Sequence, residues 1–174
     1  MTDIDFFEAF ARLLTDPTLR ARFVADRAHT VVSMCIRPGD DAQILALDPA
    51  GLVAQAATLV DKRLHEASEL IPVTWANLGT SARPMFLSYA EGEWAPDAAR
   101  PLADAARFAR HLASRGDARV HLPELHRMEF LSRGTRWSVR LVASVLRGRR
   151  RRSLDILVRM PAGAVRGVSL YLGL

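Results

Sequence analysis

The sequence predicts an α+β fold, an N-terminal helical bundle over residues 1–133 followed by a small antiparallel sheet of about three strands over residues 134–174. Two observations carry this prediction. Apolar residues recur at helical spacing through the first three quarters of the chain, and after Gly134 they recur at every second position. The change of period marks the expected domain boundary.

The first two helices are indicated by apolar spacing and by a capping signal. Residues 3–14 carry one apolar face, and Asp16 with Pro17 then begins a second helix over 15–26. Aspartate caps free helical amides, and proline suits the first helical position because its missing N–H costs no hydrogen bond there. The apolar residues of the first helix are Phe6, Phe7, Phe10, Leu13 and Leu14.

The Asp-Pro signal returns at residues 48–49 and opens the strongest predicted helix, which extends to residue 70. Pro72 ends that helix, because proline clashes with the preceding turn. Shorter helices are predicted elsewhere: 40–47 after Pro38-Gly39, 73–78 and 81–91 around Gly79, Asp97 to Leu112 before Gly116, and about Pro123 to Leu131.

Three segments of alternating polarity follow residue 134. Period-two alternation with β-branched residues is typical of strands, and turn-like stretches at 148–152 and 161–164 fit an antiparallel meander. The residues expected to share a face are Val139, Leu141, Ala143 and Val145, then Leu154, Ile156, Val158 and Met160, then Val168, Leu170 and Leu172.

Composition limits the function classes. The chain has 49% hydrophobic residues, enough for a core, and a net charge of +5 that is modest for a global binder of nucleic acid. The single cysteine, Cys35, rules out an internal disulfide and is expected to be buried and inert. An acidic N-terminus and the lack of a long uncharged apolar stretch predict a cytoplasmic protein.

The basic stretch Gly148–Arg152 is expected at a hairpin tip and allows two interpretations. Either the arginines only solvate the turn, or the cluster meets carboxylates or phosphates through paired hydrogen bonds. Nucleic acid is one candidate, but few aromatic residues lie among the arginines to stack on bases. A peptide is favoured, because a small terminal sheet has a free edge to which an extended chain can add itself as a strand.

No motif predicts catalysis. The segment 65-HEASE-69 resembles a zinc-protease helix only superficially, because that pattern needs histidine where Glu69 stands. His121 and His126 are separated by five positions across Pro123, a poor spacing for joint metal binding. The sequence has no nucleophile elbow, P-loop or dinucleotide fingerprint.

The order of segments resembles a known family, the MbnC-like partner proteins of multinuclear non-haem iron oxidative enzymes in methanobactin-type peptide biosynthesis. The resemblance rests on 15-TDPTLRARFVAD-26, 47-LDPAGLVAQAATLVDKRLHEASELIPVTWANLG-79 and 86-FLSYAEGEW-94, followed by the strand-rich tail. It implies a noncatalytic subunit that forms a heterodimer with an MbnB-like TIM-barrel oxidase. It also implies that the chain presents the leader of a ribosomal precursor peptide whose cysteine residues the oxidase modifies.

The resemblance assigns the iron to the partner enzyme, so no cofactor is expected in this chain. It also implies that the helical domain docks that enzyme. A nucleic-acid-associated regulatory domain is the alternative, motivated by the same arginines. The residues expected to bind peptide are Arg147, Arg149, Arg150, Arg151, Arg152, Val168, Leu170 and Tyr171. Two roles are open for the aromatic segment, the chain's own core and the partner interface. Its candidate interface residues are Trp75, Phe86, Tyr89 and Trp94.

Overall fold

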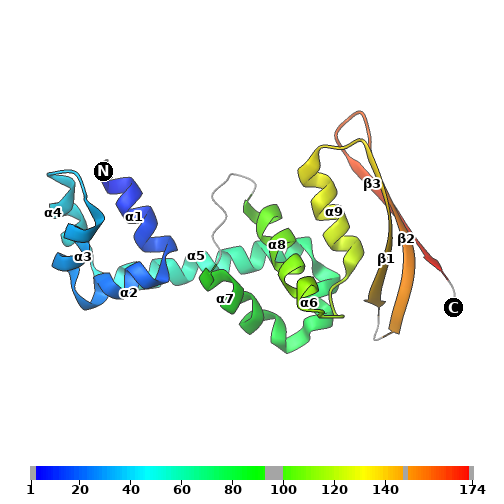
Figure 1. Cartoon of the computed structure of the whole chain (residues 1–174), viewed down its shortest axis with the longest axis horizontal. Coiled ribbons are helices and arrows are strands. Elements are labelled where there is room, and N and C mark those ends of the chain that lie inside the picture. Colours follow the sequence, from blue (N-terminus) through cyan, green and yellow to red (C-terminus); the bar gives the residue numbers. More distant parts are fainter. Residues whose placement is uncertain (1–2, 93–99, 147–148, 173–174) are drawn as a thin grey trace. The chain divides into compact units, whose positions relative to one another are not determined.

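The computed structural model describes residues 3–92, 100–146 and 149–172 and confirms the α+β prediction. A series of helices is followed by a three-stranded antiparallel sheet with the order β1-β2-β3 (Figure 1). The chain forms two compact units, which we describe separately. Unit 1 comprises Met1–Lys62 with Ala90–Trp94, and unit 2 comprises Arg63–Tyr89 with Ala95–Leu174.

Unit 1 begins with short helices whose starts are set by aspartate. Asp5, Asp16 and Asp26 each accept a hydrogen bond from a backbone amide in the first turn of the following helix. Each carboxylate thereby satisfies an amide that the helix itself cannot pair. The helices are α1 (Phe6–Thr15), α2 (Pro17–Ala25), α3 (Arg27–Met34) and α4 (Asp40–Leu45).

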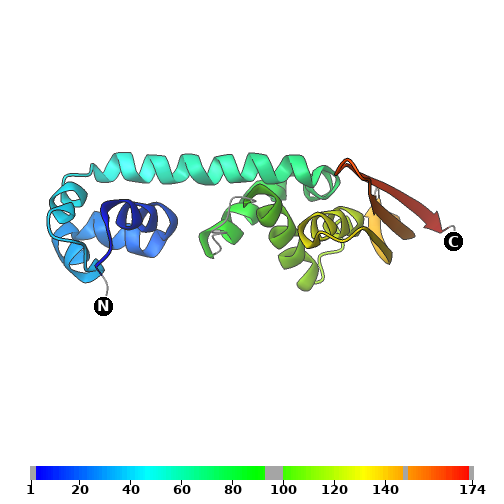
Figure 2. The ribbon, with the colours of Figure 1, turned by 90° about the horizontal axis from the view of Figure 1, so that it is seen from above.

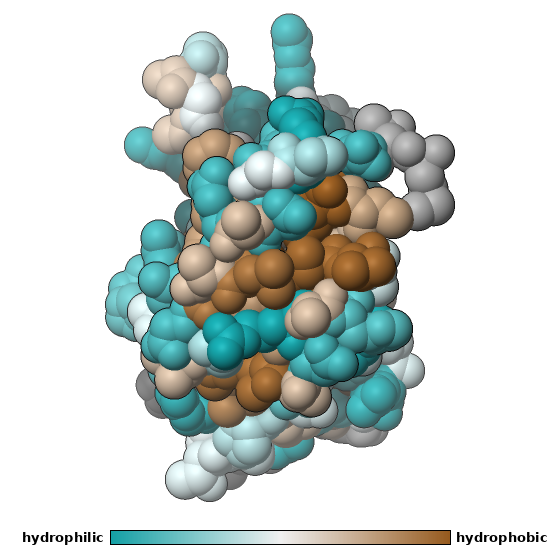
Figure 3. All heavy atoms as spheres, turned by 90° about the vertical axis from the view of Figure 1, so that its left-hand side faces the viewer, coloured by the Kyte–Doolittle hydropathy of each residue, from teal (hydrophilic) through white to brown (hydrophobic). Residues whose placement is uncertain are grey.

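The core of unit 1 lies among these helices and the start of α5 (Pro49–Leu70), a continuous helix in Figure 2. Phe23, Leu13 and Ile44 are fully buried there. A parallel bridge between Ile4 and Ile36 ties the N-terminal segment to the chain that follows α3. In Figure 3, in which the N-terminal helices face the viewer, apolar surface lies between hydrophilic patches.

Unit 2 has an aromatic core built from its helices. Phe86 and Phe108 are fully buried with their ring centroids 5.1 Å apart, and Trp75 and Tyr89 pack on both of them. The helices are the last part of α5, α6 (Pro72–Leu78), most of α7 (Ala82–Gly92), α8 (Arg100–Ser114) and α9 (Leu122–Arg133), with a short 3₁₀ turn at Gly79–Ser81.

A buried ion pair joins two of these helices. Arg63 of α5 donates from Nε and Nη2 to the two carboxylate oxygens of Asp104 on α8, at 2.8 and 2.9 Å. Both side chains are almost completely buried. A paired, two-bond contact of this kind satisfies charges that would otherwise be costly to bury.

The sheet of unit 2 consists of β1 (Trp137–Leu146), β2 (Arg149–Arg159) and β3 (Val165–Leu172). Leu146 pairs with Arg149, and residues 147–148 between them lie outside the described residues. The expectation that residues 148–152 form a turn is wrong for Arg149–Arg152, because these residues pair with β1 as part of a strand.

Two further differences from the sequence prediction concern the N-terminal half. The helix α3 was not predicted, and Cys35, expected to be buried, is only half-buried at the C-cap of that helix with a left-handed φ of 52°. The compact units also divide the chain within α5, whereas a boundary was expected after residue 133. The sheet shares its unit with α6–α9 because α9 packs against β1 and β2.

Within the described ranges, no helix combines the length and the hydropathy that crossing a membrane requires.

Candidate functional site

The two outer strands of the sheet each have a neighbour on one side only. The order β1-β2-β3 gives β2 two partners, and the described residues supply no further strand beside β1 or β3. An unpaired strand edge presents backbone N–H and C=O groups that are available to another extended chain.

The hydrogen-bond register tells which groups of β3 point outward. Met160 N donates to Ala164 O at 2.8 Å, and Arg159 N donates to Arg136 O at 2.8 Å. Because bonded and non-bonded pairs alternate in an antiparallel ladder, the residues of β3 paired with even-numbered β2 positions bond to β2. The remaining backbone groups, at Val165, Gly167, Ser169 and Tyr171, point away from the sheet.

One face of the sheet is covered by α9 and is mainly polar. Buried Ser153, Asp155 and Leu157 of β2 lie on this inner face, together with Val142 of β1. A Cβ atom at Gly167 would lie 2.6 Å from Leu157 Cδ2, so a larger residue there would force the buried Leu157 side chain to shift. The inner face therefore anchors the sheet to α9 through polar contacts and few apolar ones.

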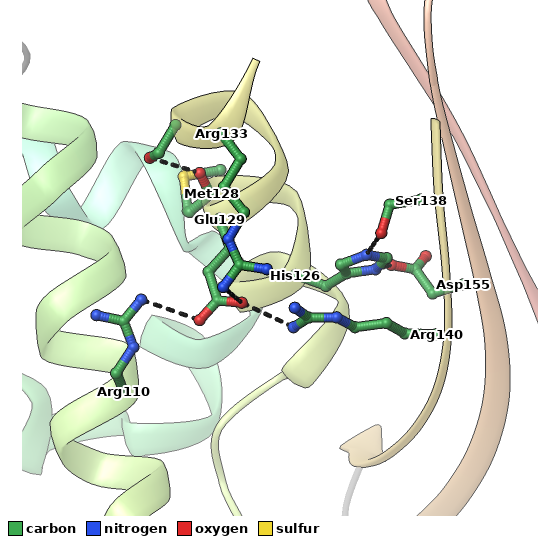
Figure 4. Close-up of polar contacts among 9 residues, drawn as sticks. Arg110, His126, Met128, Glu129, Arg133, Ser138, Arg140 and Asp155 are labelled. Atoms are coloured by element: carbon green, nitrogen blue, oxygen red, sulfur yellow. Dashed lines mark hydrogen bonds and ion pairs between the residues drawn. The ribbon is translucent and has the colours of Figure 1, made fainter. Parts of the chain in front are cut away.

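A buried polar network runs from α9 through all three strands. The His126 Nδ1 atom lies 2.5 Å from Asp155 Oδ2, and Nε2 lies 2.7 Å from Ser138 Oγ (Figure 4). Ser169 of β3 donates from its hydroxyl to the other oxygen of Asp155 at 2.7 Å. With its proton on Nδ1, the imidazole donates to Asp155 and accepts from Ser138, so every buried group has a partner.

The sequence Asp155–His126–Ser138 has the order of hydrogen bonds found in serine hydrolases. A hydrolase also needs amide donors aimed at a developing oxyanion beside the serine. Ser138 lies within β1, on the face that α9 covers, and its backbone belongs to the strand ladder. We therefore interpret the network as the tie that holds the sheet on α9.

A second cluster beside this network centres on Glu129 of α9. Its carboxylate accepts hydrogen bonds from Arg110 of α8 at 2.9 Å and from Arg140 of β1 at 2.7 Å (Figure 4). Burial would raise the pKa of Glu129, but the two guanidinium groups outweigh it and hold the pKa below its usual value. One carboxylate thus links α8, α9 and the sheet.

The outer face of the sheet carries the apolar residues whose alternation predicted the strands, and it is exposed. Trp137, Leu141 and Val168 keep 70%, 65% and 57% of their surface accessible. Cross-strand rows join these residues, such as Leu141–Leu154–Leu170 and Val139–Ile156–Val168. We call this surface the outer face; its apolar members are Trp137, Val139, Leu141, Ala143, Leu154, Ile156, Val158, Val168, Leu170 and Leu172.

The sheet segment is strongly basic. Residues 134–174 contain nine arginines and one acidic residue, Asp155, which leaves fifteen basic and eighteen acidic residues in the first 133. The only carboxylate of the segment is buried against His126. Within the described part of the segment, the exposed side chains of Arg136, Arg151, Arg152 and Arg166 form no ion pair.

The structure gathers most of the predicted peptide-binding residues on one sheet. Val168, Leu170 and Tyr171 lie exposed on the edge strand β3, and Arg151 and Arg152 lie exposed on β2. Arg149 and Arg150 belong to the start of β2. Arg147 lies outside the described residues.

The predicted partner-interface residues fare differently. Phe86 and Tyr89 are 0% and 5% exposed, and they pack with Phe108 in the core of unit 2. The expectation that these two side chains line a partner interface is wrong, because the chain's own helices cover them. Trp75 is half-buried against the same cluster. Trp94 lies outside the described residues.

The histidines form no metal site among the described residues, where no group of three potential ligands is found. His65 and Glu69 form an exposed contact at 3.4 Å across one helical turn. His121 is buried, and desolvation lowers its pKa below the ordinary value. Spacing along the sequence did not reveal the role of His126, because its hydrogen-bond partners Ser138 and Asp155 lie on strands, 12 and 29 positions away.

Comparison with known families gives one match. Residues 46–114 match the family described as SCO6045-like, C-terminal domain. The matched residues extend from just before α5 to the end of α8 and do not include α9 or the sheet. No curated protein and no solved structure matches the chain.

Proposed function

We infer that the chain is a noncatalytic partner subunit that binds an extended peptide along β3 and presents it to a separate modifying enzyme. The observation that carries this proposal is the free edge of β3, whose outward backbone groups lie on the same sheet as a surplus of unpaired arginines. Backbone hydrogen bonds would supply affinity for any extended chain. The arginines would favour a chain with acidic residues.

The enzyme in this proposal is an MbnB-like TIM-barrel iron oxidase, and the peptide is a ribosomal precursor with cysteine residues to be modified. Both follow from the family resemblance of the sequence, and the free edge supports the peptide-binding part. The catalytic metal would belong to the oxidase. Both ring nitrogens of His126 are already hydrogen-bonded, one to Asp155 and the other to Ser138.

Calorimetric titration of the full chain with the candidate precursor peptide tests the proposal. Tyr171→Pro removes an outward N–H of β3 and leaves the bonds to β2 intact, because an edge strand tolerates proline on its free side. We expect this variant to bind about two- to tenfold more weakly, since one lost backbone hydrogen bond is worth about 0.5–1.5 kcal/mol.

Tyr171→Ala is the matched control, because it removes the same side chain and keeps the N–H. Equal weakening by the two variants would assign the effect to the phenol ring and argue against strand addition. Wild-type protein that fails to bind the precursor, and fails to co-purify with the co-expressed oxidase, would contradict the proposed function itself.

Charge reversal tests the role of the arginines. Replacing Arg149, Arg150 and Arg151 with glutamate should weaken peptide binding while leaving the circular dichroism spectrum unchanged, because the three residues begin β2 and the Arg151 side chain is exposed. Unchanged affinity for the peptide would indicate that these arginines only solvate the surface.

A nucleic-acid-associated regulatory role is the second candidate, favoured by the nine arginines in the last 41 residues. Its signature is an affinity for DNA or RNA that falls steeply with salt as fewer counterions are released. A mobility-shift assay from 50 to 200 mM salt separates the two, since the peptide proposal expects no shift of either nucleic acid.

A further inference from the structure

We propose that the outer face of the sheet is a docking surface for a folded protein partner whose contact region is apolar and bordered by carboxylates. This surface differs from the free edge of β3, since it consists of side chains and not of backbone groups. The inference goes beyond the proposed function and holds whether or not a peptide adds to the edge.

The first argument is the inversion of polarity between the two faces. The chain covers the inner face, which carries Ser138, Asp155 and Ser169, and exposes the outer face, which carries two complete cross-strand rows of apolar side chains. A sheet with a single covered face ordinarily turns its apolar side toward that cover. The outer face therefore has the composition of a surface that something else buries.

The second argument is size. The outer face consists of three strands about 4.8 Å apart, and each contributes about eight residues at about 3.3 Å per residue. Its flat area is therefore roughly 400 Å², without the additional area of the side chains that project from it. Contiguous apolar patches of about 300–600 Å² are the largest found on typical monomers and are often functional. Trp137 at one end of the face adds an aromatic anchor of the kind enriched at protein interfaces.

The third argument is charge. Arg152 lies on the outer face beside Ala143 and Leu172 at one end, and Arg166 lies beside Val158 at the other end. Both side chains are exposed and have no ion-pair partner among residues of the described ranges. No acidic residue shares this face, because the one acid of the segment, Asp155, lies buried on the inner face. Carboxylates at both ends of the partner's apolar region would complement this pattern.

The same charges disfavour a second copy of the chain as the occupant. If two outer faces met with their strands in the same direction, Arg152 would face Arg152. If one copy were turned end for end, Arg152 would face Arg166. Either arrangement places like charges together at both ends of an apolar interface, which is costly in a desolvated contact.

Site-specific photo-crosslinking in the native host tests the inference. The full chain carries p-benzoylphenylalanine at Val168 on the outer face, or at Arg127, an exposed position of α9 in the same unit, as the control. We expect one protein adduct from the Val168 position and none from Arg127. Mass spectrometry of the adduct should place the crosslink in an apolar segment flanked by aspartate or glutamate.

Charge reversal completes the test. With the crosslinker at Val168, the double variant Arg152→Glu and Arg166→Glu should lower adduct yield at least about tenfold, because both ends would then repel the acidic border. The apolar variant Leu141→Asp should do the same through the centre of the face. A crosslinked segment without acidic neighbours, or a yield unchanged by these substitutions, would overturn the inference.

Four other results would also overturn it: an adduct with the precursor peptide alone, a dimer of the chain crosslinked to itself, an adduct with membrane lipid, or no adduct above that of the Arg127 control. Peptide titration of the same variants separates this inference from the proposed function. Leu141→Asp is expected to retain affinity for the precursor, since it lies on β1 and away from the edge of β3.

Discussion

At the scale of single residues, His126 is the side chain on which the attachment of the sheet depends. It is 2% exposed and contacts Asp155 of β2 and Ser138 of β1. Removing the hydrogen-bond partner of a buried carboxylate leaves its charge without compensation, and that loss is larger than the net value of the contact.

His126→Ala should therefore lower the free energy of unfolding by about 3–5 kcal/mol, because Asp155 would keep only the Ser169 hydroxyl as a partner. Ser138→Ala should cost only about 1 kcal/mol, since it removes one neutral donor. Urea denaturation of the two variants measures both values. A His126→Ala protein as stable as wild type would show that the network does not hold the sheet.

The structural interpretation of the Asp155–His126–Ser138 order has a chemical test. Because the Ser138 backbone belongs to the ladder with β2 and α9 covers this face, a fluorophosphonate probe should not label the wild-type chain at this residue. Stoichiometric labelling that disappears in Ser138→Ala would establish a hydrolase site and contradict the noncatalytic assignment.

Glu129 predicts the acid sensitivity of unit 2. Arg110 and Arg140 hold its folded-state pKa below the usual value of 4.5, so its contribution to stability is complete above that value. As the pH falls through the lower folded-state pKa, the carboxylate is protonated and that contribution is lost. Thermal unfolding from pH 6 to 3 should show a smaller loss of stability in Glu129→Gln than in wild type.

Glu129→Gln itself should cost about 1 kcal/mol at pH 7, because both arginines remain partly exposed to water and solvent screens their interaction with the carboxylate. Parallel pH curves for the two proteins would mean that Glu129 does not account for the acid sensitivity.

The roles of these residues could not be predicted from the sequence, for a physical reason. The pairing of His126 with Asp155 spans 29 positions and depends on how α9 lies on the sheet. Spacing along one helix can suggest metal ligands, as it did for His65 and Glu69, but it carries no information about contacts between distant elements. The aromatic residues Phe86 and Tyr89 illustrate the same limit, because an apolar side chain suits a core and an interface equally.

At the scale of elements, the strands were predictable and the side they expose was not. Alternation in Val139, Leu141 and Ala143 correctly indicated a shared face. Alternation does not say which face the rest of the chain covers. The burial of Asp155 became possible because a histidine on α9 and a serine on β3 hydrogen-bond to its carboxylate.

A matched pair of substitutions, one on each face of the sheet, tests which face the chain itself buries. Leu157→Ala on the inner face should destabilise the protein by about 2–5 kcal/mol, because Leu157 is almost completely buried. Leu141→Thr on the outer face should change stability by less than about 0.5 kcal/mol, since water already reaches that side chain. Equal costs would indicate that the outer face is buried in the free chain.

The helices show where local signals suffice. Aspartate followed by proline marked the starts of α2 and α5, and the carboxylate of Asp16 caps α2 as expected. The helix α3 lacks a proline at its start and has the β-branched pair Val31-Val32 inside it, so its intrinsic preference is weak. Burial of Val31 and Met34 in unit 1 stabilises it instead.

At the scale of the whole molecule, charge is segregated along the chain. The net charge of +5 conceals a segment, residues 134–174, that exceeds its single acid by eight arginines, and a preceding region in which acids outnumber bases by three. The net charge of the whole chain therefore does not reveal how positive the sheet segment is, although the arginine cluster itself was visible in the sequence.

This segregation predicts moderate salt dependence for binding of an acidic peptide. Raising the salt from 50 to 500 mM should weaken the interaction by screening the arginines, while the backbone bonds along β3 and the apolar contacts persist. Titration calorimetry at the two salt concentrations measures the change. Complete loss of binding at 500 mM would indicate attraction by charge alone and would favour the nucleic-acid alternative.

The central claim is that a foreign strand adds to β3, and amide hydrogen exchange followed by NMR tests it most directly. In the free chain the outward amides of Gly167, Ser169 and Tyr171 should exchange rapidly, whereas saturating precursor peptide should protect them and leave the amides of β1 unchanged. A peptide that binds while all β3 amides keep their original exchange rates would contradict the account.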